Sequence, residues 1–369
     1  MLTRWAVPVL LAVTLTAAAC GSGEDPPEAT GTAPATPLAA RATTPPEPPE
    51  PAVQPKHAPA AAVPGRDPRS ADVARPDRTV GDGTPGSCTS EAVVKAVAAG
   101  GVIVFSCGPD PMTITMTATA KVRNSSSQVV LDGGGLVTLS GGGSRRILYQ
   151  NTCDQELGWT TSHCQDQATP RLTLQNIGFA DGNSTGETAE GGGGGAVFVR
   201  GGRLKVAGVR FTGNRCDPSG PDLGGAALRV LSQYQGRAVG VSGSTFKDGV
   251  CSNGGAISGI GTSWRIEDST FTGNRAIGSG ANPSRPGTQG GGSGGAIYAD
   301  GNLFTITVLR SRITGNSARE GGGAIFFVSN DRTGTLVLDH AKLSANPSKG
   351  FETRGYPGIF FIGAGVKVR

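Results

Sequence analysis

The chain of 369 residues has few of the side chains that build common functional sites. Its three histidines, His57, His163 and His340, lie far apart, and none of its seven cysteines forms a Cys-x-x-Cys pair, so the usual zinc-site spacings are absent. Aromatic residues make up only 5% of the chain. A Ser/His/Asp pattern, a P-loop and a dinucleotide-binding fingerprint are also missing, which removes the most familiar hydrolase and nucleotide-binding signatures.

Long apolar runs are missing after residue 20, so no later segment supplies the roughly 20 apolar residues that a membrane-spanning helix needs. Glycine is abundant, with 60 residues, but it follows no three-residue period, which excludes a collagen. The hydrophobic content of 37% is too high for a wholly disordered chain. The composition changes along the chain, because residues 24–80 hold 14 of the 25 prolines and residues 81–369 hold 56 of the 60 glycines.

The net charge of +5 is carried by the glycine-rich part, where 26 Lys and Arg residues face 20 Asp and Glu residues. These basic residues are scattered along the sequence and form no run. Such a distribution favours acidic polymers in general but lacks the clustered footprint of a nucleic-acid-binding domain. We therefore expect no nucleic-acid partner.

The first twenty residues have the pattern of an export signal. Arg4 precedes a short apolar run at 5–15, and three alanines at 17–19 lead to Cys20. This ending resembles a bacterial lipoprotein signal, although Ala17 stands where that family usually has leucine. The resemblance implies that residues 1–19 are removed and that a lipid on Cys20 holds the protein at the outer face of the bacterial cell membrane. Without lipidation, the protein would simply be secreted.

Residues 20–80 read as a disordered stalk rich in proline and alanine. Stretches such as TTPPEPPEPAVQP at 43–55 cannot bury apolar surface, and their prolines favour an extended polyproline II conformation. At about 3.1 Å per residue, the segment 24–80 would reach at most ~180 Å. We therefore expect three parts, namely a signal at 1–19, a linker at 20–80 and a folded domain at 81–369.

Two motifs alternate through the glycine-rich part. Gly-Gly-Ala followed by further residues of mainly apolar type begins at 194, 224, 254, 294 and 322. A second motif, Phe-x-Gly-Asn or a variant of it, occupies 179–182, 211–214, 246–249, 271–274, 313–316 and 343–346. Seven and five residues before the start of all six copies, the residue is apolar, and two such positions face the same side of a strand. Each repeat therefore predicts three short strands, which form one coil of an all-β parallel β-helix solenoid.

Coils stacked about 4.8 Å apart would place equivalent residues in columns. One column would lie inside the solenoid, and we call it the inner column. It would consist of Phe179, Phe211, Phe246 and Phe271, followed by Ile313 and Leu343. A second column, at a corner, would consist of Asn214, Asn274, Asn316 and Asn346. These amides would form either a hydrogen-bonded ladder inside the turns or a set of ligand contacts.

Besides Cys20, six cysteines remain, an even number that suits disulfides in an exported chain. Cys216 and Cys251 each lie five residues after the start of their motif, so one rung would bring their Cα atoms within disulfide range. Closeness in the sequence suggests the other two pairs, Cys88–Cys107 and Cys153–Cys164.

The expected ends of the solenoid differ. Residues 90–97 read as a short amphipathic helix with Ser90 as its N-cap, placed to cover the apolar end of the first coil. Strands of the first coils are expected at 102–107 and 129–141, and a last, shortened rung at 358–361.

These phased motifs, the capping helix and the Leu-Asp-Gly-Gly-Gly strand at 131–135 resemble the repeats of polymorphic outer-membrane proteins. They also resemble right-handed parallel β-helix proteins of the pectate-lyase fold. The resemblance covers residues 110–346 and implies a right-handed coil. It also implies two alternative functions, which are surface adhesion and, in the pectate-lyase group, polysaccharide lyase or glycosidase action on an acidic polysaccharide.

Insertions follow the Phe-x-Gly-Asn corner at 183–193, 215–223, 275–293 and 317–321, and solenoid insertions tend to gather on a binding face. Four charged residues alternate in sign along the same edge, namely Asp181, Arg215, Asp248 and Arg275. They are the candidate catalytic residues of a lyase; otherwise they form a solvent-exposed ion ladder. Asp181 and Asp248 would lie about 10 Å apart, which is too far to share one calcium ion.

We favour a non-enzymatic surface protein that binds glycan, cell wall or another cell, and we expect no metal or cofactor for it. Calcium enters only under the lyase alternative, because that group often uses the ion. Candidate aromatics for sugar stacking are Trp159, Tyr234 and Tyr298, unless they pack into the corners instead.

Overall fold

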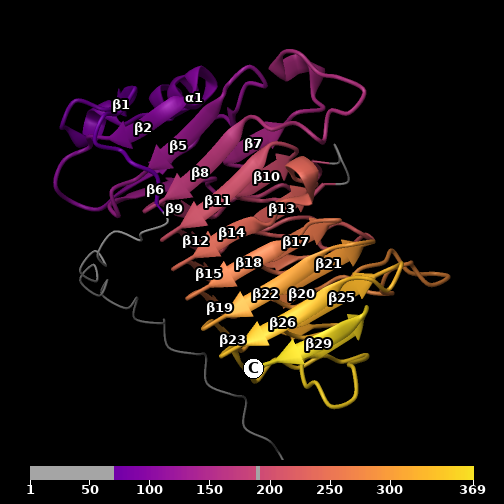
Figure 1. The fold of residues 1–369 in the computed structure, drawn as a ribbon. Coiled ribbons are helices and arrows are strands. Elements are labelled where there is room, and N and C mark those ends of the chain that lie inside the picture. The colour runs from indigo at the N-terminus through magenta and orange to yellow at the C-terminus, as the bar shows by residue number, and fades with distance from the viewer. Residues whose placement is uncertain (1–69, 188–191) are drawn as a thin grey trace, which may run out of the picture. The chain divides into compact units, whose positions relative to one another are not determined.

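A computed structural model describes residues 70–187 and 192–369, and these residues wind into a right-handed parallel β-helix (Figure 1). Each complete coil contributes one strand to sheet A, then one to sheet B and one to sheet C, and every strand pair within the sheets is parallel. The predicted fold class is confirmed. The expected signal at 1–19, the lipidation site Cys20 and the linker as far as residue 69 lie outside the described residues.

Three long sheets and one short sheet make up the described part of the stack. Sheet A contains β1 (Arg78–Val80), β2 (Gly101–Phe105), β5 (Gln128–Asp132), β8 (Arg171–Gln175), β11 (Arg203–Ala207), β14 (Val239–Ser242), β18 (Trp264–Glu267), β22 (Thr305–Leu309), β26 (Thr335–Asp339) and β29 (Gly365–Val368). Sheet B contains β3 (Met112–Thr115), β6 (Val137–Ser140), β9 (Gly178–Ala180), β12 (Arg210–Thr212), β15 (Thr245–Lys247), β19 (Thr270–Thr272), β23 (Arg312–Thr314) and β27 (Lys342–Ser344). Sheet C contains β4 (Ala120–Lys121), β7 (Leu148–Asn151), β10 (Val197–Arg200), β13 (Leu228–Leu231), β17 (Ile257–Ile260), β21 (Ile297–Gly301), β25 (Ile325–Ser329) and β28 (Ile359–Ile362). Sheet D contains β16 (Val250–Cys251), β20 (Arg275–Ala276) and β24 (Ser317–Ala318).

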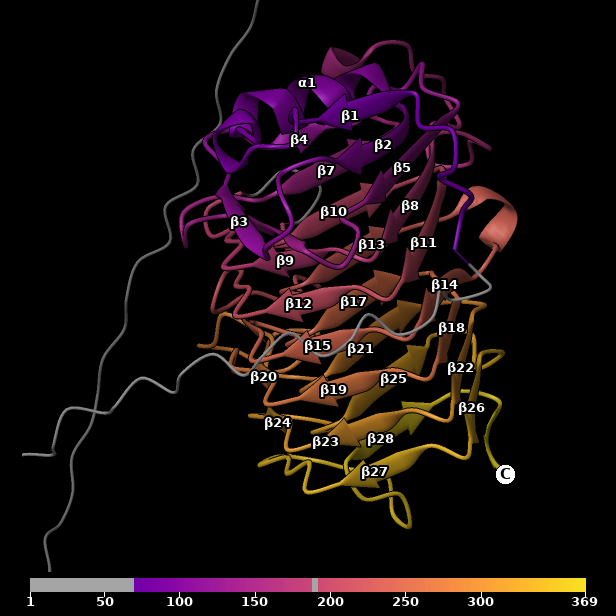
Figure 2. The ribbon, with the colours of Figure 1, turned by 90° about the vertical axis from the view of Figure 1, so that its left-hand side faces the viewer.

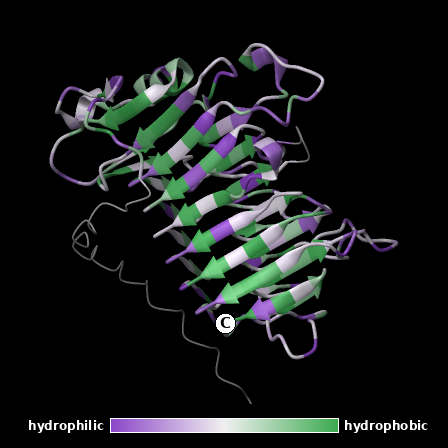
Figure 3. Ribbon diagram, viewed as in Figure 1, coloured by the Kyte–Doolittle hydropathy of each residue, from purple (hydrophilic) through white to green (hydrophobic). Residues whose placement is uncertain are grey.

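The strands of the three long sheets enclose the main apolar core. Along many of these strands hydrophobic and hydrophilic residues alternate, as Figure 3 shows. Behind sheet B the four phenylalanines of the inner column pair in register and stack, with centroid distances of 5.4, 4.8 and 4.5 Å between successive rings. None of these rings is more than 1% exposed. Fully burying one phenylalanine stabilises a fold by roughly 1.5–3 kcal/mol, so the four rings together contribute about 6–12 kcal/mol.

The asparagine column lies inside the corner that follows sheet B. Asn274 Nδ2 donates to Asn316 Oδ1 at 2.8 Å, and Asn316 Nδ2 donates to Asn346 Oδ1 at 2.9 Å. Where glycine replaces asparagine in a motif, its backbone N–H forms the hydrogen bond to the next coil, as Gly249 N does by donating to Asn274 Oδ1 at 3.0 Å. All four asparagines are at most 9% exposed. The column is therefore a turn ladder between coils, and its amides are too buried for ligand contacts.

Helix α1 (Ser90–Ala99) covers the first coil and packs against β1, β2 and β4. The N-cap differs from the prediction by one residue, because the side chain of Thr89 accepts from Ala92 N, whereas Ser90 Oγ accepts from Thr117 N at 2.9 Å. Short 3₁₀ turns occupy η1 (Pro85–Ser87), η2 (Gln155–Leu157) and η4 (Tyr234–Gly236). Among the described residues, no helix is both long and apolar enough to cross a membrane.

The β-helix begins before the expected boundary at residue 81. Strand β1 pairs with β2, and ahead of it Ala71 N donates to Gln175 Oε1 at 2.8 Å while Gln175 Nε2 donates back to Ala71 O at 3.1 Å. Gln175 is fully buried, and its amide also donates to Asp132 Oδ2 at 2.7 Å. Residues from about 71 onward therefore belong with the folded domain, because a buried amide needs these backbone partners.

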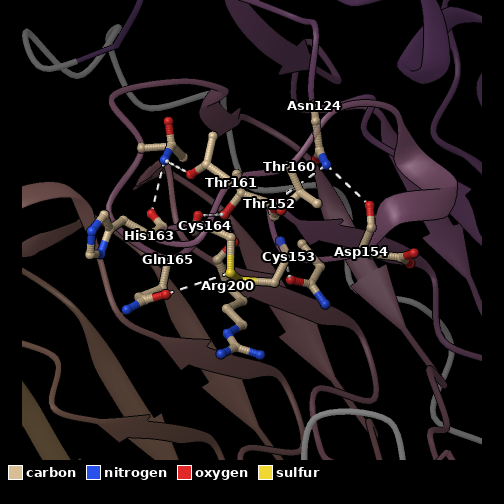
Figure 4. The surroundings of a disulfide bond; sticks show 12 residues. Asn124, Thr152, Cys153, Asp154, Thr160, Thr161, His163, Cys164, Gln165 and Arg200 are labelled. Atoms are coloured by element: carbon tan, nitrogen blue, oxygen red, sulfur yellow. Dashed lines mark hydrogen bonds between the residues drawn. A yellow bond between two sulfur atoms is a disulfide. The ribbon is translucent and has the colours of Figure 1, made fainter.

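All three expected disulfides are present, with Cα–Cα distances of 5.7 Å for Cys88–Cys107, 4.9 Å for Cys153–Cys164 and 4.8 Å for Cys216–Cys251. Figure 4 shows the second of these bonds, which closes the insertion between β7 and β8. Asn124 Nδ2 holds that insertion by donating to the carbonyl oxygens of Asp154 and Trp159, each at 3.1 Å.

Candidate functional site

The corner between sheets B and C carries the insertions, and we call it the insertion flank. It consists of sheet D with segments 181–187, 215–223, 275–293 and 317–321; residues 188–191 of the first insertion lie outside the described residues. Equivalent positions of successive coils lie side by side along it, in the order Asn183, Arg215, Val250, Arg275 and Ser317. The flank therefore has the coil-by-coil register that the spacing of the repeated motifs predicted.

Asp181 and Asp248 occupy a position that is shaped by the backbone. Their φ angles of +49° and +55° are left-handed, and the equivalent residues Gly213, Gly273 and Gly315 have φ between +64° and +68°. Aspartate tolerates this conformation better than most residues that have a Cβ, so a turn requirement alone accounts for both carboxylates. A coil containing Gly213 separates the two, and the structure does not bring them together.

Asp181 and Arg215 do share a depression of about 420 Å³, together with Asn183 and the backbone of glycines 142, 143, 182 and 213. Asp248 and Arg275 do not line it. Asp248 instead lies 3.7 Å from Lys247 Nζ, and both side chains are 55% exposed, so this ion pair contributes little to stability. The four sequence candidates thus divide into one pair at a depression and two separate surface residues.

A second depression, of about 290 Å³, lies farther along the flank. Its apolar lining includes Pro218 and Ile277. Its polar lining is formed by Ser219, Ser279, Thr288, Gln289 and Arg319. Within residues 70–187 and 192–369, no carboxylate lies within ion-pair distance of the Arg319 guanidinium, which therefore keeps its donors available. Hydroxyl, amide and guanidinium groups beside apolar side chains are suited to a sugar ring with an acidic substituent.

The walls of this depression are tied to the coils. Glu320, which is only 9% exposed, accepts from Gly280 N at 2.9 Å and from the guanidinium of Arg285 at 2.6 Å. Ser252 Oγ donates to Gly220 O at 2.7 Å, and Gly220 N donates to Gly290 O at 3.1 Å. The long insertion 275–293 is thus held against its neighbours, which preorganises the depression for binding.

Tyr298 anchors the other side of that insertion and is fully buried, so it is not available for sugar stacking. Its hydroxyl lies 3.0 Å from Asp222 Oδ1 and 3.3 Å from Asp300 Oδ2, and Asn282 Nδ2 donates to the hydroxyl at 2.7 Å. Burial raises the pKa of the Tyr298 hydroxyl and, with the neighbouring Asp222 charge, that of the Asp300 carboxyl. Arg229 occupies the position equivalent to Tyr298 two coils earlier in sheet C. Burial lowers the pKa of its guanidinium to about 10.

The other two aromatic candidates remain accessible. Trp159 is 46% exposed, and the half-buried Tyr234 carries the Arg203 guanidinium 5.2 Å from its ring centre. Neither residue lines the two depressions. Over the part of the chain that the structure describes, no group of three or more His, Cys, Asp or Glu side chains is placed to hold a metal ion.

Sequence reasoning missed Arg319 and its depression. The lining residues come from three insertions that are up to about a hundred positions apart, and no local motif links them. The left-handed turn position, in contrast, had a signal, because either glycine or aspartate occupies it in five of the six motif copies.

Comparison with known families gives one match. Residues 268–300, which run from the turn before β19 to β21, match the Chlamydia polymorphic membrane protein repeat. No curated protein and no solved structure matches the chain. The matched repeat, within a right-handed parallel β-helix, points to a protein of the outer membrane or the cell surface.

Proposed function

We propose that this protein is an exported, lipid-anchored surface protein that attaches to glycan or cell wall through its insertion flank. The observation that carries the proposal is the depression at Arg319, where an exposed arginine with no acidic partner among the described residues lies beside four hydroxyl and amide side chains. The polymorphic membrane protein repeat supports a surface location, and the Ala-Ala-Ala-Cys ending supports a lipid on Cys20.

Retention on glycan tests the binding part of the proposal. Purified protein is applied to immobilised cell-wall glycan and to acidic oligosaccharides, and its dissociation constant is measured. Arg319→Ala should weaken binding about tenfold, because it removes the charged donor that would hold an acidic substituent. Arg237→Ala is the matched control, since Arg237 is an exposed arginine in the turn between sheets C and A, away from the flank. Equal binding by wild type and Arg319→Ala would remove the flank as the site.

Membrane fractionation tests the anchor. In the producing cells, the wild type should partition with the membrane, and Cys20→Ser should leave the protein soluble or secreted, because one cysteine carries the whole lipid attachment. A membrane-bound Cys20→Ser variant would contradict lipid anchoring at this residue without affecting the glycan measurement.

A second candidate function, a polysaccharide lyase or glycosidase, is favoured by one observation. Asp181 and Arg215 line the same depression, so a carboxylate and a guanidinium could contact one sugar unit there. Incubation with polygalacturonate and alginate, with and without calcium, would reveal lyase turnover as unsaturated-product absorbance and glycosidase turnover as released reducing ends. Turnover that is lost in Arg215→Ala and kept in Arg275→Ala would establish an enzyme at this depression; no turnover would leave the attachment protein.

A further inference from the structure

The outward side of sheet B has an unusual composition, and we call it the sheet B face. In each strand from β9 onward one residue of the inner column points into the core, and Ile114 in β3 and Leu139 in β6 take its place in the first two coils. The residues on either side of these positions therefore face outward. The face consists of Thr113, Thr115, Thr138, Ser140, Gly178, Ala180, Arg210, Thr212, Thr245, Lys247, Thr270, Thr272, Arg312, Thr314, Lys342 and Ser344. Ten of these sixteen positions carry a hydroxyl and four carry a positive charge, whereas none is acidic or aromatic.

The positive side chains of this face are open to solvent and weakly partnered. Arg210, Lys247, Arg312 and Lys342 are all exposed. Arg210 donates to a backbone carbonyl at 3.1 Å, and among the described residues Lys247 has one long contact, at 3.7 Å, with Asp248. For Arg312 and Lys342, no carboxylate of residues 70–187 or 192–369 lies within 4.0 Å. The four cations are therefore free to be neutralised by an outside partner.

Carboxylates adjoin the face in the sequence just beyond its strand ends, and one of them is Asp110, two residues before β3. Asp181 and Asp248 follow the last residues of β9 and β15, and Asp268, two residues before β19, is held by the Arg310 guanidinium at 2.8 Å. These groups border the face but do not interrupt its columns, so the face keeps an excess of positive charge.

Register makes this face a straight strip. Figure 2 shows the strands of sheet B lying one above another from β3 to β27. From Arg210 to Lys342 the strip crosses four rungs, or about 19 Å at 4.8 Å per rung. Hydroxyls fill the positions between the cations, and Thr314 and Ser344 are already hydrogen-bonded across one rung at 2.8 Å.

We propose that the sheet B face binds a linear, negatively charged polysaccharide that lies along the stack of coils. The inference rests on the proposed attachment function and names a second, extended site and the charge class of its ligand. The anionic groups, whether sulfate, phosphate or carboxylate, pair with the cations, and the sugar hydroxyls exchange hydrogen bonds with the threonines. An anionic membrane would engage apolar or aromatic side chains as well, and a single-stranded nucleic acid would stack on aromatics; the face has neither.

Binding of charged polymers to the full chain tests the inference. Dextran sulfate and polygalacturonate separate sulfate from carboxylate, uncharged dextran is the comparison, and phosphatidylglycerol vesicles represent the membrane alternative. Wild type should bind at least one charged polymer, and its affinity should fall between about 50 mM and about 500 mM NaCl, since screening weakens exposed ion pairs. Arg312→Glu/Lys342→Glu should lower the affinity about tenfold or more.

The control is Arg237→Glu/Arg332→Glu, which changes the net charge equally at two exposed arginines between sheets C and A. It should keep the affinity within about twofold of wild type, and equal urea midpoints should show that both variants fold. Equal loss in the two double variants, equal binding of uncharged dextran, or binding of vesicles alone would overturn the inference. Retention on cell-wall glycan without binding of charged polymer would overturn only this inference; no retention on either would overturn the attachment function as well.

Discussion

Replacing Asn316 by alanine should destabilise the β-helix strongly, since this side chain joins three coils. Its Oδ1 accepts from Asn274 N at 3.0 Å and from Asn274 Nδ2 at 2.8 Å. Its Nδ2 donates to Phe271 O at 3.1 Å and to Asn346 Oδ1 at 2.9 Å. The side chain is fully buried, so water cannot replace these partners without opening the corner.

The magnitude follows from the groups left behind. Leaving the buried Asn274 N–H without its acceptor costs about 1–3 kcal/mol. The four other lost hydrogen bonds, which include one from Nδ2 to Thr314 O at 3.2 Å, cost about 0.5–1.5 kcal/mol each. These contributions add up to about 3–9 kcal/mol, so Asn316→Ala should lower the free energy of unfolding by at least about 3 kcal/mol, a large share of the roughly 5–15 kcal/mol that is typical of a folded domain.

Urea denaturation followed by circular dichroism measures this loss as a lower midpoint at an unchanged slope. Asn302→Ala is the control, because Asn302 is exposed and a substitution there should change stability by less than about 0.5 kcal/mol. If the two variants unfolded at the same urea concentration, the asparagine column would not hold the coils together, and its burial would need another explanation.

Three further perturbations probe the turns, the buried charges and the cross-links. Gly273→Ala should cost more than Gly315→Ala in the same assay, since φ is +68° and +67° at these positions but a Cβ meets a neighbouring carboxylate only at 273. Burial raises the pKa of the Asp300 carboxyl, so at a pH just above the ordinary aspartate pKa the folded state binds more protons than the unfolded state. The free energy of unfolding therefore falls as the pH rises through that window. In denaturation curves recorded between about pH 4 and about pH 6, Asp300→Asn should flatten this fall. Cys216→Ala/Cys251→Ala should lower stability by about 4 kcal/mol in the same assay, because it opens a cross-link spanning 35 residues. Full reduction of the wild type should lower stability further, since it also opens the other two cross-links.

Strict repetition explains why the interior could be predicted from the sequence. Phe211 and Phe246 recur at one place in successive motifs, and parallel pairing leaves only one register that buries both rings. The same register fixed Cys216 opposite Cys251 and set the asparagines in line. Where each coil repeats the same inward residues, the local sequence pattern is enough to predict which residues are in tertiary contact.

Features without repetition escaped prediction for physical reasons. The strand at 78–80 is only three residues long, and its partner is fixed by the fold rather than by its own composition. Thr89 and Ser90 are adjacent hydroxyls with similar capping ability, and the contact with Thr117 decides which one begins the helix. Arg319 gains its surroundings from insertions whose paths depend on tertiary hydrogen bonds such as that of Glu320 with Gly280 N.

The uniform register of sheet B has an evolutionary consequence. A duplicated or deleted coil would keep the same inward phenylalanine and the same outward pair of positions, so the rod could lengthen or shorten without redesign of its neighbours. Each added coil would extend the row of outward side chains by one step. For a multivalent polymer, avidity would then depend on the number of coils, and evolution could change the binding strength of the protein without a new type of contact.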